Sequence, residues 1–477
     1  MLWLSVLSVP FSYGISVILA RISPEALGTY GLLGIYIGLV ATLLYFGGNA
    51  TAIKFVPELH AADRLSFVAS YFLIVCLALV PWLTAASLWP AGLHYLLGRN
   101  ASSSFQVFIL CLSPLYIVYS LSLAGLTGML EIKWAKGLDR MVTVGAFLTY
   151  AMLFVAARTF LRTHYVAIIW GIYLGWVALA GGMGLARFMR LNEWRVHLRE
   201  FRFFLPPGFW PYTLGLQVNS ILGFLMGRLE YIFLLNAGGI LLLGEYVAVR
   251  TLASVVWKPM AYVYDSMMPA ITNALADKKL DAAREIVETY VRIILPVGLA
   301  TGLLAMFFAG SLVSVFGRRY QGLGYLVQLF ASFAAIGGLN GFLSILLNAC
   351  GRSQSVAAAK ALRIGFILIL FWPLWGRYQL LGAILVAGLA ECFHQCSLLV
   401  LVRWKSGINF SLLRTYGPFL MTLTLAGILV VSLTTKLWMS WLGIWVGILL
   451  VFLASAGYTW GEIGRLGRLI VPFRLMK

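Results

Sequence analysis

Charged residues are scarce in this chain. Only 11% of its 477 residues are Asp, Glu, Lys or Arg, and only 16 are acidic. Soluble domains carry about a quarter charged residues, so no soluble domain of ordinary size fits this composition. The shortage of carboxylates also disfavours a membrane enzyme of glycan assembly, which would need a long extramembrane loop with clustered acids. Such an enzyme stays the least favoured alternative.

Signatures of catalysis are missing as well. The chain holds no Walker A loop, HExxH, GxSxG or GxGxxG pattern, which disfavours nucleotide, metalloprotease and acyl-transfer chemistry. Its five cysteines lie in or beside apolar runs and predict no disulfide framework. Cys392, His394 and Cys396 are neighbours, but steps of two residues point side chains to different helix faces, and no second ligand cluster exists. We expect a non-enzyme without a metal or cofactor.

Long hydrophobic runs dominate the chain instead. Hydrophobic residues make up 61% of it, and the mean hydropathy is +0.93. A bilayer core about 30 Å thick needs roughly 20 apolar helical residues. Fourteen such runs predict an all-α, polytopic integral membrane protein. They begin near Leu2, Tyr30, Ser66, Ser104, Arg140, His164, Pro211, Gly244, Val291, Tyr325, Val356, Tyr378, Tyr416 and Trp438.

Basic residues alternate between the connections. Of 35 Lys and Arg, 24 follow even-numbered runs or lie in the tail, 9 lie in the opposite connections, and Arg250 and Lys258 fall within the eighth run. Because basic loops stay cytoplasmic, we expect a multi-pass protein of the inner (plasma) membrane with both termini inside. Orientation and contact with anionic membrane lipids explain the net charge of +19, so nucleic acid is not an expected partner.

Residues 187–207 interrupt the hydrophobic rhythm. Apolar residues recur there at helical spacing among arginines, which predicts an amphipathic basic helix on the inner leaflet. This linker separates a six-helix bundle at 1–186 from a second at 208–402. Residues 403–477 add two further spans and a basic cytoplasmic tail. Residues 277–292 predict a short cytoplasmic helix extension with a Glu288–Arg292 pair.

Charges inside the spans are the candidate functional residues, because a buried charge in a membrane usually faces an interior or aqueous cavity. In a continuous eighth helix, Arg250 and Lys258 would lie roughly 9 and 21 Å from its outer end. A cationic pair there would suit a diphosphate linker or acidic sugars. The alternative is a structural ion pair with Glu230 or Asp265.

Two further spans carry polar pairs. In the seventh, Gln217 and Arg228 share one helix face, whereas Asn219 and Glu230 share the opposite one, so only one pair can face a cavity.

In the twelfth span, Glu391 and His394 lie on the same side. They predict a proton-coupling site, because a buried carboxyl and an imidazole can exchange protons near neutral pH. The alternative is a satisfied polar contact between helices.

Three stretches resemble bacterial polysaccharide exporters and O-antigen-type flippases, of the superfamily that also holds multidrug and toxin extruders and lipid II flippases. They are SPEALGTYGLLGIYIGLVATLLYFGGNATAIKFVPE at Ser23–Glu58, GRLEYIFLLNAGGILLLGEYVAVRTLASVVWKPM at Gly227–Met260 and LLNACGRSQSVAAAKALRI at Leu346–Ile364. The resemblance implies two six-helix bundles, alternating access and a lipid-linked oligosaccharide cargo. Family members commonly carry an acidic-basic pair in the first helix of the second half, whereas this chain has Arg228 before Glu230.

The sequence and the resemblance together predict a flippase that moves a lipid-linked oligosaccharide or polysaccharide precursor across the cytoplasmic membrane. Expected partners are the glycolipid, anionic lipids, and a polysaccharide polymerase and glycosyltransferases. The main alternative is a multidrug or toxin extruder of the same fold. Its cavity would be dominated by carboxylates that bind cationic drugs, which Arg250 and Lys258 disfavour.

Overall fold

A computed structural model describes residues 2–44, 49–88, 103–129, 131–192, 202–256, 258, 260, 271 and 280–405. All regular structure among these residues is helical, which confirms the predicted all-α class. Eight of the described helices are long and apolar enough to cross a membrane, and a bent pair at Arg318–Ala335 and Gly337–Ala349 makes a ninth. The chain is a multi-pass membrane protein. The predicted thirteenth and fourteenth spans lie outside the described residues.

The first six predicted spans correspond to the helices before residue 192. These helices are α1 (Leu2–Ile22), α2 (Pro24–Leu44), α3 (Asn49–Glu58), α4 (Ala61–Leu88), α6 (Ser103–Gly128), α7 (Ile132–Ala156), α8 (Arg158–Thr163) and α9 (Tyr165–Leu191).

The seventh and eighth predicted spans are joined in one long helix, α11 (Phe209–Ala253). A straight helix of 45 residues would be about 67 Å long, far more than a bilayer core requires. Gly239 divides α11 because its φ of 74° and ψ of −175° are not helical. A side chain would strain this conformation, so glycine is the residue suited to the bend. The two limbs of α11 are residues 209–238 and 240–253.

The remaining described helices follow the turn at 254–256, which interrupts the predicted eighth span. They are α13 (Leu280–Phe307), α14 (Ala309–Phe316), η2 (Arg318–Leu323), α15 (Gly324–Ile336), η3 (Gly337–Leu339), α16 (Asn340–Ala349), α17 (Ser353–Tyr378) and α18 (Leu380–Lys405). A 3₁₀ turn, η3, therefore interrupts the tenth predicted span, and the flanking segments are bent by 45°.

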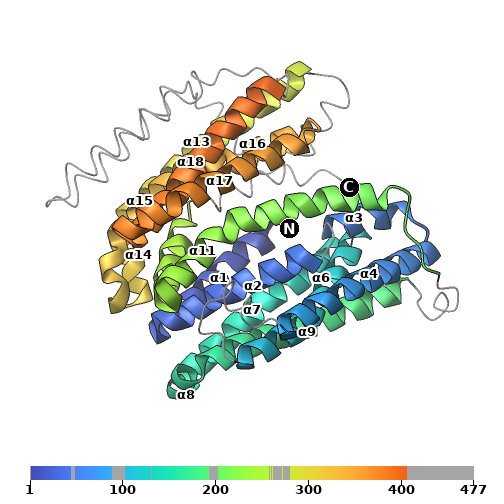
Figure 1. Ribbon diagram of the computed structural model, residues 1–477, viewed down its shortest axis with the longest axis horizontal. Helices are drawn as coiled ribbons and strands as arrows, with labels where there is room; N and C mark the ends of the chain where they lie inside the picture. Colours follow the sequence, from blue (N-terminus) through green and yellow to red (C-terminus); the bar gives the residue numbers. More distant parts are fainter. Residues whose placement is uncertain are drawn as a thin grey trace. The chain divides into compact units, whose positions relative to one another are not determined.

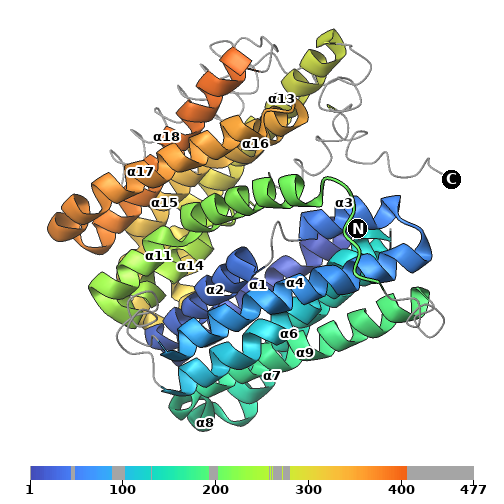
Figure 2. The same cartoon turned by 45° about the vertical axis from the view of Figure 1, so that its right-hand side comes forward.

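The first compact unit comprises Met1–Thr251, Ser314–Gln321 and Ile367–Ala383. Within it α4, α6, α7 and α9 run side by side (Figures 1 and 2). Small residues allow this packing: a Cβ added at Gly181 of α9 would lie 3.0 Å from the Tyr119 Cα of α6. Phe188 of α9 is buried against Gly125 of α6.

A row of glycines on α2 packs against both limbs of α11 in this unit. Gly28 approaches the Ile240 carbonyl, Gly34 the Arg228 guanidinium, and Gly38 the Phe224 ring. Gly244 of the second limb also meets α2, since a Cβ at Gly244 would lie 3.0 Å from the Gly28 nitrogen. The glycine row therefore brings the backbone of α2 directly against the polar residues of α11.

The second compact unit comprises Leu252–Val313, Gly322–Phe366 and Ile384–Lys477. Here α13 packs on α15, where a Cβ at Gly302 would lie 2.8 Å from Ala335. Val287 and Val291 of α13 are fully buried, so this face of the helix packs on the protein. The division into bundles at 1–186 and 208–402 stays a prediction, because these units group residues by contact and not by position along the chain.

Two local expectations differ from the structure. The predicted inner-leaflet helix begins inside α9, which extends through Leu191; residues 193–201 lie outside the described part. Within α13, Glu288 is bonded to Arg284 at 3.1 Å, and the predicted Glu288–Arg292 pair stays a prediction because the Arg292 side chain lies outside the described part. The eighth span is not one continuous helix, because a turn at 254–256 follows α11. Thr301 donates a hydrogen bond of 2.9 Å to the Val256 carbonyl at this break.

Candidate functional site

Arg228 lies on the first limb of α11, partly buried inside a span. Its guanidinium carbon is 5.1 Å from the centre of the Tyr231 ring, one helical turn further on. On the other side it packs on α2, where a Cβ at Gly34 would lie 3.4 Å from Nη2. No carboxylate among the described residues forms an ion pair with Arg228. A cation in a membrane without an acidic partner is a strong candidate for binding an anionic ligand.

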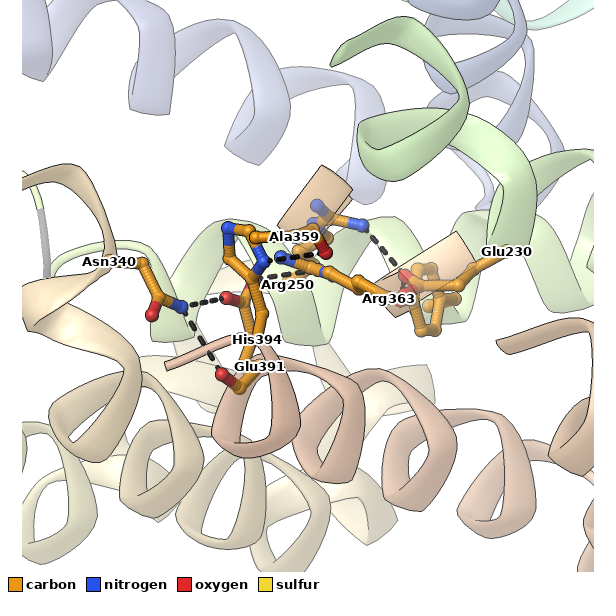
Figure 3. Close-up of polar contacts among 8 residues, drawn as sticks. Glu230, Arg250, Asn340, Ala359, Arg363, Glu391 and His394 are labelled. Atoms are coloured by element: carbon orange, nitrogen blue, oxygen red, sulfur yellow. Dashed lines mark hydrogen bonds and ion pairs between the residues drawn. The ribbon is translucent and has the colours of Figure 1, made fainter. Parts of the chain in front are cut away.

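Glu230 and Arg250 form an ion pair between the two limbs of α11. Arg250 Nη1 lies 3.0 Å from Glu230 Oε2, and the Tyr246 hydroxyl donates to the same oxygen at 2.6 Å. Figure 3 shows this pair. The Glu230 side chain is 1% exposed, whereas that of Arg250 is 25% exposed. The structural ion pair considered as the alternative role for Arg250 is therefore present, while its guanidinium stays partly accessible.

Tyr231 connects the two arginines. The Arg250 guanidinium carbon lies 5.0 Å from the centre of its ring, and that of Arg228 lies 5.1 Å from it. Tyr231 also makes an edge contact with Tyr246, at 5.3 Å between ring centres. Aromatic rings hold guanidinium groups by cation–π attraction without neutralising them. We call Arg228, Glu230, Tyr231, Tyr246 and Arg250 the two-arginine cluster.

The other predicted residues of the seventh span lie nearer the start of α11. Gln217 donates a hydrogen bond to the Thr42 carbonyl of α2, so its amide ties two helices together. Asn219 is partly buried two residues further on. Neither residue contributes to the two-arginine cluster. Their predicted role in binding cargo stays a prediction.

Lys258 follows the turn after α11 and is half-buried. It belongs to the second compact unit, whereas Arg250 belongs to the first. The depths expected for a continuous helix therefore do not apply to this pair. Whether both bind one cargo molecule stays a prediction.

Glu391 of α18 forms the centre of a second polar group, in the second unit. Its Oε1 lies 2.8 Å from Arg363 Nη2 of α17, and Asn340 of α16 donates to its Oε2 at 2.7 Å. Figure 3 shows the Asn340 contact. Asn340 begins α16 directly after the 3₁₀ break, so Glu391 ties α17 and α18 to the broken span. The alternative reading, a polar contact between helices, describes this geometry.

His394 is 2% exposed, and its Nδ1 lies 3.2 Å from the Ala359 carbonyl of α17. It faces the same neighbouring helix as Glu391, but no hydrogen bond joins the two side chains. Proton coupling through this pair stays a prediction. Among the described residues, no three His, Cys, Asp or Glu side chains lie close enough together to hold a metal ion.

Sequence reasoning missed Arg363, Asn340 and Tyr246. The alternation of basic residues assigns Arg363 to a cytoplasmic connection, yet it is 3% exposed and lies well inside α17. The helix begins at Ser353, ten residues earlier, which places Arg363 about 15 Å along its axis. The available signal was the acid at Glu391, since a buried carboxylate in a span requires a partner.

Solved structures of one superfamily share this fold. The lipid II flippase MurJ in an inward closed conformation has a TM-score of 0.62 and 13% identity, covering 95% of this chain and 99% of that one. An inward-facing multidrug resistance MATE family transporter of the MOP superfamily has a TM-score of 0.63 and 13% identity, covering 91% and 96%. A MOP superfamily transporter from Pyrococcus furiosus, whose description reports a binding pocket of reverse polarity, has a TM-score of 0.56 and 15% identity, covering 86% and 96%.

No protein-family profile and no curated protein sequence matches the chain. The likeness to solved structures is therefore the basis for assigning the fold. At identities of 13–15% it shows the fold alone. The chain has the fold of MOP-superfamily transporters and flippases over almost its whole length. The superfamily resemblance expected from the sequence is confirmed at this level.

Proposed function

We propose that this chain is a flippase that moves a lipid-linked oligosaccharide or polysaccharide precursor across the cytoplasmic membrane by alternating access. The observation that carries the proposal is Arg228, a partly buried intramembrane guanidinium that forms no ion pair with a carboxylate in the part of the chain that the structure describes. Its neighbour Arg250 is partly accessible despite its pair with Glu230. Phosphates and acidic sugars are the anionic groups that guanidinium recognises best. A glycan on a lipid phosphate or diphosphate carries such a group at the membrane surface.

The alternative, an extruder of cationic drugs, requires accessible carboxylates. Glu230 and Glu391 are the intramembrane acids predicted to matter, and each is paired with an arginine. A cationic drug would have to displace a guanidinium from either of them. The MATE-type fold is compatible with both cargoes, whereas the charge of the two-arginine cluster favours the anionic one.

The proposal includes a location and partners. The asymmetry of basic residues supports an inner-membrane protein with both termini in the cytoplasm, where glycosyltransferases would supply the glycolipid and anionic lipids would contact the basic connections. A polymerase on the other side would consume the cargo. No ATP is required by this scheme, since alternating access can be driven by gradients.

Surface glycan in a strain that lacks the native gene tests the proposal. Wild type should restore the glycan. Arg228→Ala and the double variant Arg250→Ala, Lys258→Ala should not, although removing charges favours membrane insertion. Arg162→Ala, at an exposed position of α8, is the charge-matched control and should restore it. Normal glycan levels with Arg228→Ala would contradict the proposed site.

A further inference from the structure

The ion pair in the two-arginine cluster is incompletely bonded. Glu230 is 1% exposed and uses only Oε2, which accepts both the Tyr246 hydroxyl and Arg250 Nη1. Its other oxygen, Oε1, is buried and has no hydrogen-bond partner among the described residues. A purely structural carboxylate in a dry site would have donors on both oxygens, because an unbonded buried oxygen costs stability. Glu230 is therefore held through one carboxylate oxygen only.

The two partners differ in accessibility. Arg250 keeps 25% of its side chain exposed, whereas Glu230 is enclosed. An anion approaching from outside would therefore reach the guanidinium without contacting the carboxylate. Phosphate binds guanidinium best through two parallel hydrogen bonds, and Glu230 already occupies one of the terminal nitrogens.

The charges of the cluster limit which anion can displace Glu230. Arg228, Arg250 and Glu230 together leave one positive charge, so a monoanion would neutralise these three side chains. A group with two or more negative charges would leave an excess of negative charge. The bound anion would then repel the Glu230 carboxylate beside it. A diphosphate has the required charge.

From this geometry we infer that Glu230 is a built-in competitor that occupies Arg250 until the diphosphate of the cargo displaces it, and that reclaims Arg250 when the cargo leaves. The inference rests on the proposed function and adds to it the chemical class of the linker and a release step. Tyr246 positions the carboxylate through its hydroxyl. Glu230 is thus a specificity-determining residue that binds no cargo itself.

Competition has a measurable signature. A protein whose binding-competent form is a small fraction of the total binds its ligand more weakly by that fraction. Glu230→Gln removes the charge that competes for Arg250 but keeps the size of the side chain. It should tighten binding of inorganic diphosphate about tenfold, if about a tenth of the wild-type protein is competent. Transport should show a lower KM together with a lower kcat, because release becomes slow.

Titration calorimetry of the full-length protein in detergent, with inorganic diphosphate as the probe, tests this inference. Glu245→Gln neutralises an acid that lies on the second limb of α11, as Arg250 does, but outside the cluster, and is the control for total charge. It should leave the affinity unchanged. Tyr246→Phe keeps every charge and only loosens Glu230, so it should tighten binding by a smaller factor, and it serves if Glu230→Gln does not fold.

The outcomes separate the two claims. If wild type flips a lipid-linked glycan in vesicles but neither Glu230→Gln nor Tyr246→Phe binds diphosphate more tightly, Glu230 is only structural and the competitor inference fails alone. If wild type neither flips the glycolipid nor binds diphosphate, both the inference and the proposed function fail. Equal tightening by Glu245→Gln would also overturn the inference, since total charge would then explain the effect.

Discussion

Charged residues are rare in this protein, and a charged side chain buried inside a span needs a partner. Arg363 illustrates the constraint: it is 3% exposed in α17 and is neutralised by Glu391 at 2.8 Å. Arg228 forms no ion pair with a carboxylate among the described residues. It is less deeply buried than Arg363, and we propose that a bound anion supplies its counter-charge.

Glu391→Gln should destabilise the protein by about 3–5 kcal/mol, because it leaves the Arg363 guanidinium buried without its counter-charge. Replacing both residues, as Arg363→Leu with Glu391→Leu, should recover most of the loss, since no uncompensated charge remains. Thermal unfolding in detergent measures both. A double variant as unstable as the single one would show that the pair does not act as a unit.

The coupling hypothesis for Glu391 and His394 needs a variant that stays folded. If the two residues relay a proton, the folded double variant at 363 and 391 should transport cargo independently of an imposed pH gradient. His394→Gln should have the same effect with less destabilisation. Reconstituted vesicles with and without a gradient provide the measurement. Gradient dependence that survives in both variants would remove these residues from the mechanism.

At the scale of helices, backbone approach determines where the polar side chains lie. The α2 glycines at 28, 34 and 38 meet α11 directly, and the bend at Gly239 lets one helix supply Arg228, Glu230 and Arg250 to one cluster. The sequence predicts these helices well, because hydrophobic length and glycine spacing are local signals. It does not predict that Arg250 and Lys258 are separated by a break at 254–256, since that break depends on tertiary contacts such as the one from Thr301.

Gly28→Ala should destabilise the protein by about 1–3 kcal/mol, because the new Cβ would collide with the Ile240 carbonyl, which is backbone and cannot rotate away. Gly171→Ala is the matched control: it is also a helix-interior glycine in a span, but nothing lies within 4 Å of its added Cβ. It should be neutral or stabilising by about 0.5–1 kcal/mol, from helix propensity. Unfolding temperatures compare the two, and equal shifts would contradict the packing described for α2 and α11.

At the scale of the whole molecule, the alternation of basic residues agrees with contacts inside the first unit. Two basic residues of the connection after the sixth predicted span are bonded to acids of two other even-numbered connections: Arg187 to Glu131 at 3.3 Å, and Arg202 to Asp63 at 2.7 Å. Arg21, from an odd-numbered connection, instead contacts the Val315 carbonyl. The orientation that this alternation predicts stays a prediction. The partner of Arg363 could not be predicted from composition, because its acid lies 28 residues away on another helix.

Cysteine labelling in intact cells should place these two groups on opposite sides of the membrane. In a variant without its five native cysteines, Arg319→Cys in η2 should react with a membrane-impermeant maleimide added outside. Lys133→Cys at the start of α7 should react only after the cells are opened, because basic connections stay cytoplasmic. Labelling of position 133 in sealed cells would reverse the proposed orientation.

If this chain moves an anionic lipid-linked glycan and holds its head group at Arg228, as proposed, the purified protein alone should flip such a lipid. The most direct test is flipping of a fluorescent polyprenyl diphosphate-linked sugar in vesicles that contain only the purified protein, followed by quenching of the outer leaflet. Wild type should expose the whole lipid pool, and Arg228→Ala should lower the rate at least tenfold, about 1.4 kcal/mol in the barrier. Equal rates for wild type and Arg228→Ala, or no flipping by wild type above protein-free vesicles, would contradict the account.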